Sequence, residues 1–248
     1  MKVLKFTLGG RTAFFKKPDV NSYYYFTYGN IHRVAILGIL GAILGYKGYN
    51  QQTEEKTVYP EFYQKLKDVK LGIVPRNDKG YIAKKVQVFN NSVGYASKEQ
   101  GGNLIVKEQW LENPKWDIYL LVEDAIGKEL CQRMVEKRFK YIPYLGKNDH
   151  GADITDVEVI NPQELISSDR VDSLIMKDCF NYQVVELDPF DIEANNESIF
   201  KYQEMLPIAL EETTNKYELE SFVLTNAPLE LKKGSLIYQC NNKIIFFF

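Results

Sequence analysis

Residues suited to capturing phosphate lie at the first turn of the chain. Arg11, Lys16 and Lys17 follow the glycine pair Gly9-Gly10 with no acidic residue among them. Phosphate binding needs positive charge held at fixed positions, and a glycine turn lets backbone N–H groups approach an anion closely. The segment predicts contact with a polyanion, and the alternative is a solvated basic loop.

Tyrosines dominate the loop that follows this turn. Tyr23, Tyr24, Tyr25 and Tyr28 could stack on unpaired bases, an interaction worth about 1–3 kcal/mol per base. Tyr28 is the strongest candidate because it lies directly before an expected helix. The alternative for each ring is packing onto the core.

A second glycine-lysine loop, Gly146-Lys147, also suits a phosphate cradle, although Asp149 nearby opposes it. The helix expected before this loop carries further positive charge at Arg133, Lys137 and Arg138.

The two histidines give little sign of metal or cofactor chemistry. His32 begins an expected helix, and His150 follows the Gly146-Lys147 loop near Asp153 and Asp156. One histidine with scattered carboxylates favours a surface loop over a metal site. The sequence words of zinc proteases, serine hydrolases and P-loop proteins are absent. We therefore expect neither a metal nor a cofactor.

Charge is distributed unevenly along a chain whose net charge is only −2. Residues 1–148 hold 24 Lys and Arg against 14 Asp and Glu, whereas residues 149–220 hold 4 against 18. This pattern predicts one face that meets an anion and another that avoids it or meets a basic partner. Chance clustering of surface charge is the alternative.

The remaining composition indicates a globular protein of the cytoplasm. The chain opens on a basic, polar stretch without the apolar core of a secretory signal. Its longest apolar run, Val34–Leu44, is too short to span a bilayer, so no membrane association is expected. Cys131, Cys179 and Cys240 are far apart, which fits a reducing compartment.

A helix is expected over residues 31–45, with glycines on one stripe. Gly38, Gly41 and Gly45 lie beside an apolar stripe. Each interior glycine costs about 1 kcal/mol relative to alanine, so something must approach this helix closely. That neighbour is either another element of the fold or a bound chain.

The order of expected elements predicts an α+β fold with a ferredoxin-like β-α-β-β-α-β domain over residues 1–160. A hairpin of 104–110 with 116–123 and a helix over 125–140 belong to it, and a thumb-like insertion is expected near 76–103. Residues 161–248 are expected to form a smaller β-rich portion. Its expected elements are strands at 174–176, 183–187 and 217–224, a hairpin of 235–238 with 243–248, and a short helix at 200–210.

Three sequence words resemble a known family. The first comprises Gly10, Ala13, Phe15, Lys16 and Pro18; the second is Thr27-Tyr28 before a helix with Ala35, Gly38, Gly41, Ala42 and Gly45; the third is Tyr144-Leu145-Gly146-Lys147 with Ala152. Together they resemble CRISPR-associated protein five of the RAMP superfamily, most like its type I-B branch. The family often carries a proline within a T-Y-x-x-P word, and the chain departs from it because Gly29-Asn30-Ile31-His32 follows the Thr-Tyr pair.

The resemblance implies a non-catalytic subunit that caps the 5′ handle of CRISPR RNA in a type I Cascade complex. Its implied partners are the handle, the Cascade backbone subunit, the large subunit and, through the complex, target DNA in antiviral defence. The thumb-like insertion would touch the neighbouring backbone subunit. The residues expected to bind RNA are Arg11, Lys16, Lys17, Tyr28, Arg33, Gly146 and Lys147.

Two alternatives remain open. In the type I-C branch of the family the subunit cuts precursor RNA without metal, and Tyr46, Lys147 and His150 could do this work here. That branch carries lysine and histidine adjacent, whereas two residues separate them in this chain. The second alternative is a plain protein-interaction module whose basic residues are incidental.

Overall fold

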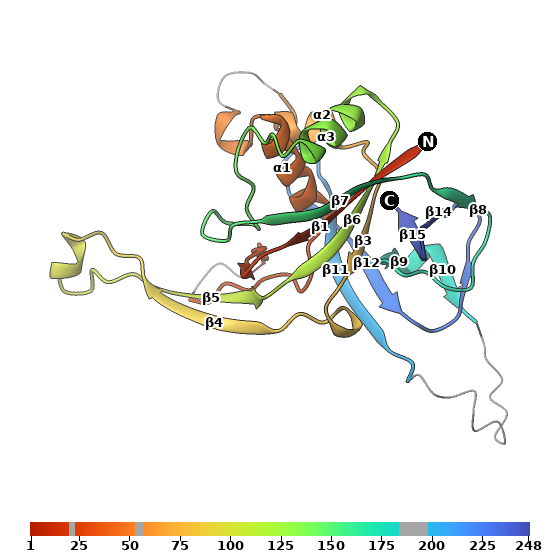
Figure 1. Cartoon of the computed structure of the whole chain (residues 1–248). Coiled ribbons are helices and arrows are strands. Elements are labelled where there is room, and N and C mark those ends of the chain that lie inside the picture. Colours follow the sequence, from red (N-terminus) through yellow and green to blue (C-terminus); the bar gives the residue numbers. More distant parts are fainter. Residues whose placement is uncertain (20–22, 53–56, 184–197) are drawn as a thin grey trace.

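The fold is α+β, as predicted, with mostly antiparallel sheets and few helices. The computed structural model describes residues 1–19, 23–52, 57–183 and 198–248. Its central sheet has four strands, each antiparallel to its neighbours, in the order β3 (Leu71–Pro75), β6 (Lys115–Val122), β1 (Lys2–Gly9) and β7 (Asp153–Ile160). Helix α1 (Arg33–Leu44) follows β1 in the chain, and α3 (Ala125–Val135) follows β6. Figure 1 shows both helices on one side of this sheet, with α2 (Glu61–Leu66) beside them.

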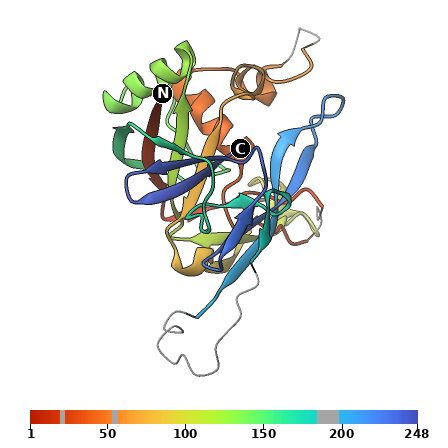
Figure 2. The same cartoon turned by 90° about the vertical axis from the view of Figure 1, so that its right-hand side faces the viewer.

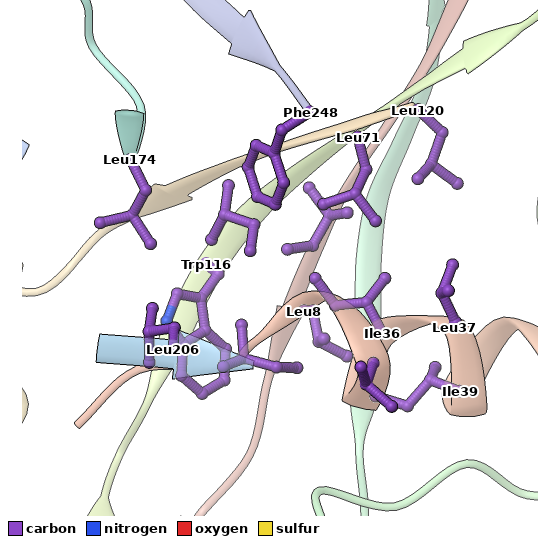
Figure 3. Packing of buried hydrophobic residues seen from close by; sticks show 14 of the residues in the cluster. Leu8, Ile36, Leu37, Ile39, Leu71, Trp116, Leu120, Leu174, Leu206 and Phe248 are labelled. Carbon is purple, nitrogen blue, oxygen red and sulfur yellow. The ribbon is translucent and has the colours of Figure 1, made fainter. Parts of the chain in front are cut away.

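Period-two alternation places the side chains of β1 on both faces of the sheet. Leu4, Phe6 and Leu8 join the core cluster under α1, whereas Val3 joins a second cluster on the opposite face. Leu8 lies beside Ile36 of α1 in Figure 3. The sheet is therefore buried on both sides.

Helix α1 begins and ends with sequence-specific caps. The His32 side chain accepts a hydrogen bond from the Ala35 N–H, which satisfies one of the free donors of the first turn. Gly45 ends the helix in the left-handed conformation, with φ 89°. The expected helix over 125–140 is shorter in the structure, because α3 ends at Val135 and Lys137 adopts φ 53°.

A long hairpin projects from the body of the molecule (Figure 1). It consists of β4 (Lys84–Asn90) paired with β5 (Ile105–Glu112), and β2 (Thr12–Ala13) pairs with the base of β5. The insertion expected at 76–103 thus captures the outgoing strand and the tip but not the returning strand. The predicted hairpin between 104–110 and 116–123 is wrong, because β6 pairs with β1 and β3 instead of β5. Asn113, with φ 46°, lies where the chain passes from one sheet to the other.

Residues after 160 add further strands. They are β8 (Gln163–Leu165), β9 (Ile175–Met176), β10 (Phe180–Tyr182), β11 (Lys201–Leu210), β12 (Tyr217–Thr225), β13 (Leu229–Leu231), β14 (Leu236–Cys240) and β15 (Lys243–Phe247). Short 3₁₀ turns lie at Tyr49–Gln51, Asp78–Gly80, Ala96–Lys98 and Lys177–Cys179. The β14–β15 hairpin is confirmed, whereas the strand expected at 183–187 lies almost wholly outside the described residues.

The short helix predicted over 200–210 is wrong, since these residues form β11. This strand pairs with β12 from Lys201, opposite Thr225, to Leu210, opposite Tyr217. Pro207, which has no N–H to donate, precedes a shift in register. Pairing with β12 therefore overrides the local sequence pattern.

The C-terminal strands share the core of the N-terminal ones. Leu206 of β11 and Phe248 lie in the same cluster as Trp116 and Leu71 of the central sheet (Figure 3). On the other face of the sheet, residues of β14 and β15 pack against Val3 and Tyr119. Figure 2 shows these dark blue strands crossing the central sheet.

Candidate nucleic-acid groove

An open groove of about 990 Å³ runs along α1. We call it the α1 groove. Helix α1 and the residues after it contribute His32, Val34, Ala35, Gly38, Ile39, Ala42, Tyr46, Gly48, Tyr49, Asn50 and Gln51. Other segments contribute Phe14, Phe15, Lys16, Phe62, Glu108, Tyr141, Ile142, Tyr144, Gly146, Lys147 and Tyr217. The groove therefore brings together all three sequence words that define the family resemblance.

The helix side of the groove is built from small residues. Ala35, Gly38 and Ala42 are partly exposed along one stripe of α1 and line the groove. A Cβ on Gly38 would have the Phe62 ring at 4.0 Å as its nearest neighbour, so this position opens onto free space. A bound chain could therefore approach the helix backbone here.

The other two glycines of α1 serve the fold. A Cβ on Gly41 would lie 2.5 Å from the Cβ of Phe62 in α2, so close helix packing fills this position. Gly45 is the left-handed cap, and a Cβ there would lie 2.7 Å from Lys140. At Gly41 and Gly45 the close neighbour is therefore another element of the fold, the first of the two alternatives expected for this stripe.

The basic residues after β1 separate in space. Lys16 is exposed, lines the groove and holds its ammonium 4.2 Å from the centre of the Tyr25 ring. Lys17 lies 3.5 Å from a carboxylate oxygen of Glu204. Arg11 is exposed on the turn between β1 and β2 and is not among the groove-lining residues. Of the three, Lys16 faces the groove.

Tyr28 and Arg33, both expected to contact RNA, are buried and do not line the groove. Tyr28 is 2% exposed and packs edge-on against His32, and burial raises the pKa of its phenol. Arg33 is 7% exposed and donates hydrogen bonds to the carbonyls of Lys67, Val69 and Ile208. Burial lowers the pKa of its guanidinium. Arg33 ties α1 to the end of α2 and to β11.

The Gly146-Lys147 loop lies at one end of the groove. Gly146 has φ 87°, and a Cβ there would lie 1.9 Å from the Phe14 carbonyl oxygen, so only glycine fits. The Lys147 ammonium lies 3.1 Å from Glu108 and 3.5 Å from Asp149. Two carboxylates therefore offset the positive charge expected to cradle a phosphate.

The three residues of the catalytic alternative do not converge on the groove. Tyr46 and Lys147 line it, and burial raises the pKa of the Tyr46 phenol. His150 is buried beneath Trp110, with its Nδ1 2.7 Å from the Thr12 hydroxyl, and is not a lining residue. Desolvation lowers the pKa of His150, which favours the neutral ring.

Sequence reasoning missed the aromatic wall of the groove. Tyr141 is 51% exposed, Ile142 is 87% exposed, and Tyr144 is also exposed. Exposed side chains of this size on one loop are typical of binding surfaces. The two tyrosines between Lys140 and Lys147, at positions 141 and 144, were a usable signal for this wall. Nothing local in the sequence placed Glu108, which reaches the groove from β5.

The described part of the chain holds neither a metal-ligand cluster nor a membrane-spanning helix. No group of three or more His, Cys, Asp or Glu side chains that could hold a metal ion occurs within residues 1–19, 23–52, 57–183 and 198–248. Within the same ranges, every helix falls short of the length and apolar character needed to cross a bilayer.

Comparison with known proteins shows the fold. No protein-family model and no curated protein matches the chain. A solved chain described as a CRISPR RNA-guided surveillance complex matches with a TM-score of 0.55 and 13% identity, over 92% of this chain and 90% of that one. A CRISPR protein from Archaeoglobus fulgidus has a TM-score of 0.49, 11% identity and coverage of 99% and 98%. A chain of the type III-B Cmr-beta complex bound to cognate target RNA has a TM-score of 0.48, 9% identity and coverage of 93% and 86%. The first of these shares its fold with almost the whole chain.

Proposed function

We propose that this chain is a RAMP-type subunit of a CRISPR effector complex and that its α1 groove holds an unpaired stretch of guide RNA. Two observations support the proposal. The fold resembles a chain of an RNA-guided surveillance complex over 92% of its length. The groove combines the residues expected from single-stranded RNA recognition, namely exposed aromatic rings and a close-approach surface.

The observation that carries the proposal is the small-residue stripe of α1 beside an aromatic wall. Ala35, Gly38 and Ala42 leave room for a sugar or base to lie against the helix, and Tyr141 and Tyr144 offer rings for stacking. Stacking on such rings is tolerant of sequence because every base has a π-face. Lys16 supplies positive charge beside this stripe.

The finer assignment is also a proposal. The RNA held would be the 5′ handle of CRISPR RNA, and the chain would join the first backbone subunit to the large subunit of a type I complex, in a type I-B-like branch. Residues 1–160 would be the ferredoxin-like RAMP domain. The β4–β5 hairpin would reach the neighbouring backbone subunit, because it projects furthest from the body (Figure 1).

We also propose that the chain holds RNA without cutting it. Metal-free cleavage needs groups that activate the 2′-hydroxyl and protonate the leaving oxygen at one place. His150 is buried under Trp110 and does not line the groove, whereas Tyr46 and Lys147 do. Incubation with precursor repeat RNA in a chelating buffer tests this point. Specific cuts that disappear in His150→Ala would replace the holding role with the endoribonuclease.

Binding of a labelled single-stranded RNA, followed by fluorescence anisotropy, tests the groove itself. Gly38→Leu fills the space beside α1 and should weaken binding at least tenfold, whereas Gly38→Ala adds one methyl group and should weaken it less. Lys16→Glu should also weaken binding, and Lys233→Glu, an exposed lysine outside the groove, is its control. Equal affinity of the Gly38→Leu and wild-type proteins for RNA would refute the α1 groove as the site.

A further inference from the structure

A buried carboxylate, that of Glu108, lies at the Lys147 end of the α1 groove. Glu108 is 5% exposed and reaches the groove from strand β5. It accepts a hydrogen bond of 2.8 Å from the Trp110 ring N–H and bonds of 3.1 and 3.4 Å from the Lys147 ammonium. A buried carboxylate is stable only when it has hydrogen-bond partners, and Trp110 and Lys147 are the partners of Glu108.

The position of this carboxylate is set from two sides. The backbone of Tyr25 pairs with the residues on either side of Glu108. The Tyr25 N–H donates to the Lys107 carbonyl, and the Tyr25 carbonyl accepts from the Gln109 N–H. The Trp110 ring, which donates to Glu108, packs edge-on against His150 with 4.6 Å between ring centres. A ligand therefore meets an acceptor that is already in place.

The charge at this end of the groove does not suit a phosphate. Lys147 lies between Glu108 and Asp149, so an approaching anion meets two carboxylates and one ammonium. An ionised carboxylate only accepts hydrogen bonds and has about four sites for them. The group that fits beside Glu108 is therefore a hydrogen-bond donor and not an anion.

We propose that Glu108 and Lys147 together read one base of the bound RNA and select a base that carries an exocyclic amine. The carboxylate accepts from the amine, and the ammonium donates to the neighbouring ring nitrogen or carbonyl of the same base. Acidic side chains accept from base amines and lysine donates to base acceptors in nucleic-acid complexes generally. Adenine, cytosine and guanine carry such an amine, and uracil does not. This inference rests on the proposed binding of RNA in the α1 groove.

Anisotropy competition with uridine decamers tests the inference. One adenosine, cytidine or guanosine replaces uridine at each position in turn. Wild-type protein should show a position at which an amine-bearing base strengthens binding at least fivefold, the lower end of the discrimination that a good base contact provides. In Glu108→Leu, which removes the acceptor, this preference should fall below twofold when the decamers are compared on the same variant. Glu112→Leu, at a partly exposed carboxylate on the same strand that does not line the groove, is the matched control and should keep the preference.

A second measurement uses only wild-type protein, so it does not depend on the folding of a variant. Purine riboside, zebularine or inosine at the preferred position removes the amine of adenosine, cytidine or guanosine respectively. The fivefold preference should disappear with the amine. Retention of the preference with these analogues, or in Glu108→Leu, overturns the base-reading role alone. Binding of all decamers with equal affinity also overturns that role alone, whereas failure of every decamer to bind overturns the proposed function as well.

Discussion

At the scale of single residues, two glycines of α1 that look alike in the sequence have opposite surroundings. A Cβ on Gly38 meets nothing nearer than 4.0 Å, whereas a Cβ on Gly41 lies 2.5 Å from the Cβ of Phe62. Gly38→Ala should therefore raise the free energy of unfolding by up to about 1 kcal/mol, through helix propensity. Gly41→Ala should lower it by about 1–3 kcal/mol, through overpacking. Urea denaturation of the two variants, one methyl group each, measures both signs, and a stabilised Gly41→Ala would contradict the packing seen here.

His32 makes stability depend on pH. Desolvation by burial lowers its pKa to about 3 in the folded protein, against about 6.5 when unfolded. The unfolded state binds more protons between these values, so the free energy of unfolding falls as pH drops below about 6.5. At pH 5 the loss from this one group is about 2 kcal/mol.

His32→Asn isolates this contribution, because asparagine also caps helix α1 without titrating. The variant should lose less stability than wild type between pH 7 and pH 5, in urea denaturation at each pH. His150 is also buried with a lowered pKa, so some pH dependence should remain in the variant. An unchanged pH profile in His32→Asn would contradict the assignment to this ring.

At the scale of elements, β11 clamps the loop that carries Lys16 and Lys17. The Glu204 carboxylate accepts the Gly29 N–H at 2.8 and 3.0 Å and the Tyr202 hydroxyl at 2.6 Å. Lys17 lies 3.5 Å from the same carboxylate. A strand from the C-terminal portion therefore holds the N-terminal loop beside the α1 groove.

Glu204→Gln should loosen this clamp. Hydrogen bonds to a charged group contribute about 1.5–3 kcal/mol each, and glutamine retains only part of that set, so we expect a loss of about 1–3 kcal/mol in stability. Chymotrypsin should also cleave faster near Tyr24. Glu218→Gln, an exposed carboxylate on β12, is the control. Equal cleavage of the two variants would show that the clamp does not hold the loop.

The elements also show what the sequence can and cannot predict. Alternation along β1 and the caps of α1 are local patterns, and α1 lies within the helix expected over residues 31–45. The partners of β5 are not local, because a turn at Asn113 is compatible either with a hairpin to β6 or with passage into another sheet. The segment 201–210 is a strand because it pairs with β12, the next strand along the chain, and this pairing overrides a local pattern that is also compatible with a helix.

Some features of the candidate site could likewise be predicted from local sequence, whereas others depend on the whole fold. Lys16 and Gly38 could be predicted as groove residues from local sequence motifs. Whether a given side chain is buried depends instead on neighbours from the whole fold. The sequence suggests that Tyr28 and Arg33 are surface residues that bind a ligand. In the structure the Tyr28 ring packs against His32, and Arg33 donates hydrogen bonds to three backbone carbonyls. Glu108 could not be predicted as a groove residue, because its place in the groove depends on the register of β5 and not on a local pattern.

At the scale of the whole molecule, the pairing of lysines with carboxylates sets the salt dependence of RNA binding. Lys17 pairs with Glu204, Lys147 pairs with Glu108, and Arg33 is buried. Each phosphate neutralised on a single strand contributes about 0.7 to the slope of log affinity against log salt. We expect a slope of only about 1–2 in magnitude from 50 to 300 mM NaCl. A slope near 3.5 would instead mean that about five cations contact phosphates, as the sequence alone predicted.

The shared core determines whether the two portions expected from the sequence fold separately. The face of the central sheet opposite α1 contributes Val3 and Tyr119 to a cluster with Ile245 and Phe247 of β15. Residues 161–248 also supply Leu206 and Phe248 to the main core. Removing them would expose large apolar side chains on both faces of the sheet.

We therefore expect residues 1–160 alone to be insoluble or to lack a cooperative unfolding transition, because burial of apolar surface is the main term that favours folding. Size-exclusion chromatography and thermal denaturation measure this. Coexpression with residues 161–248 as a separate chain is the control, and it should restore a soluble complex through the same contacts. A monomeric, cooperatively unfolding 1–160 fragment would show that the N-terminal sheet is stable without its C-terminal cover, and would leave Glu204 as a contact between two independent domains.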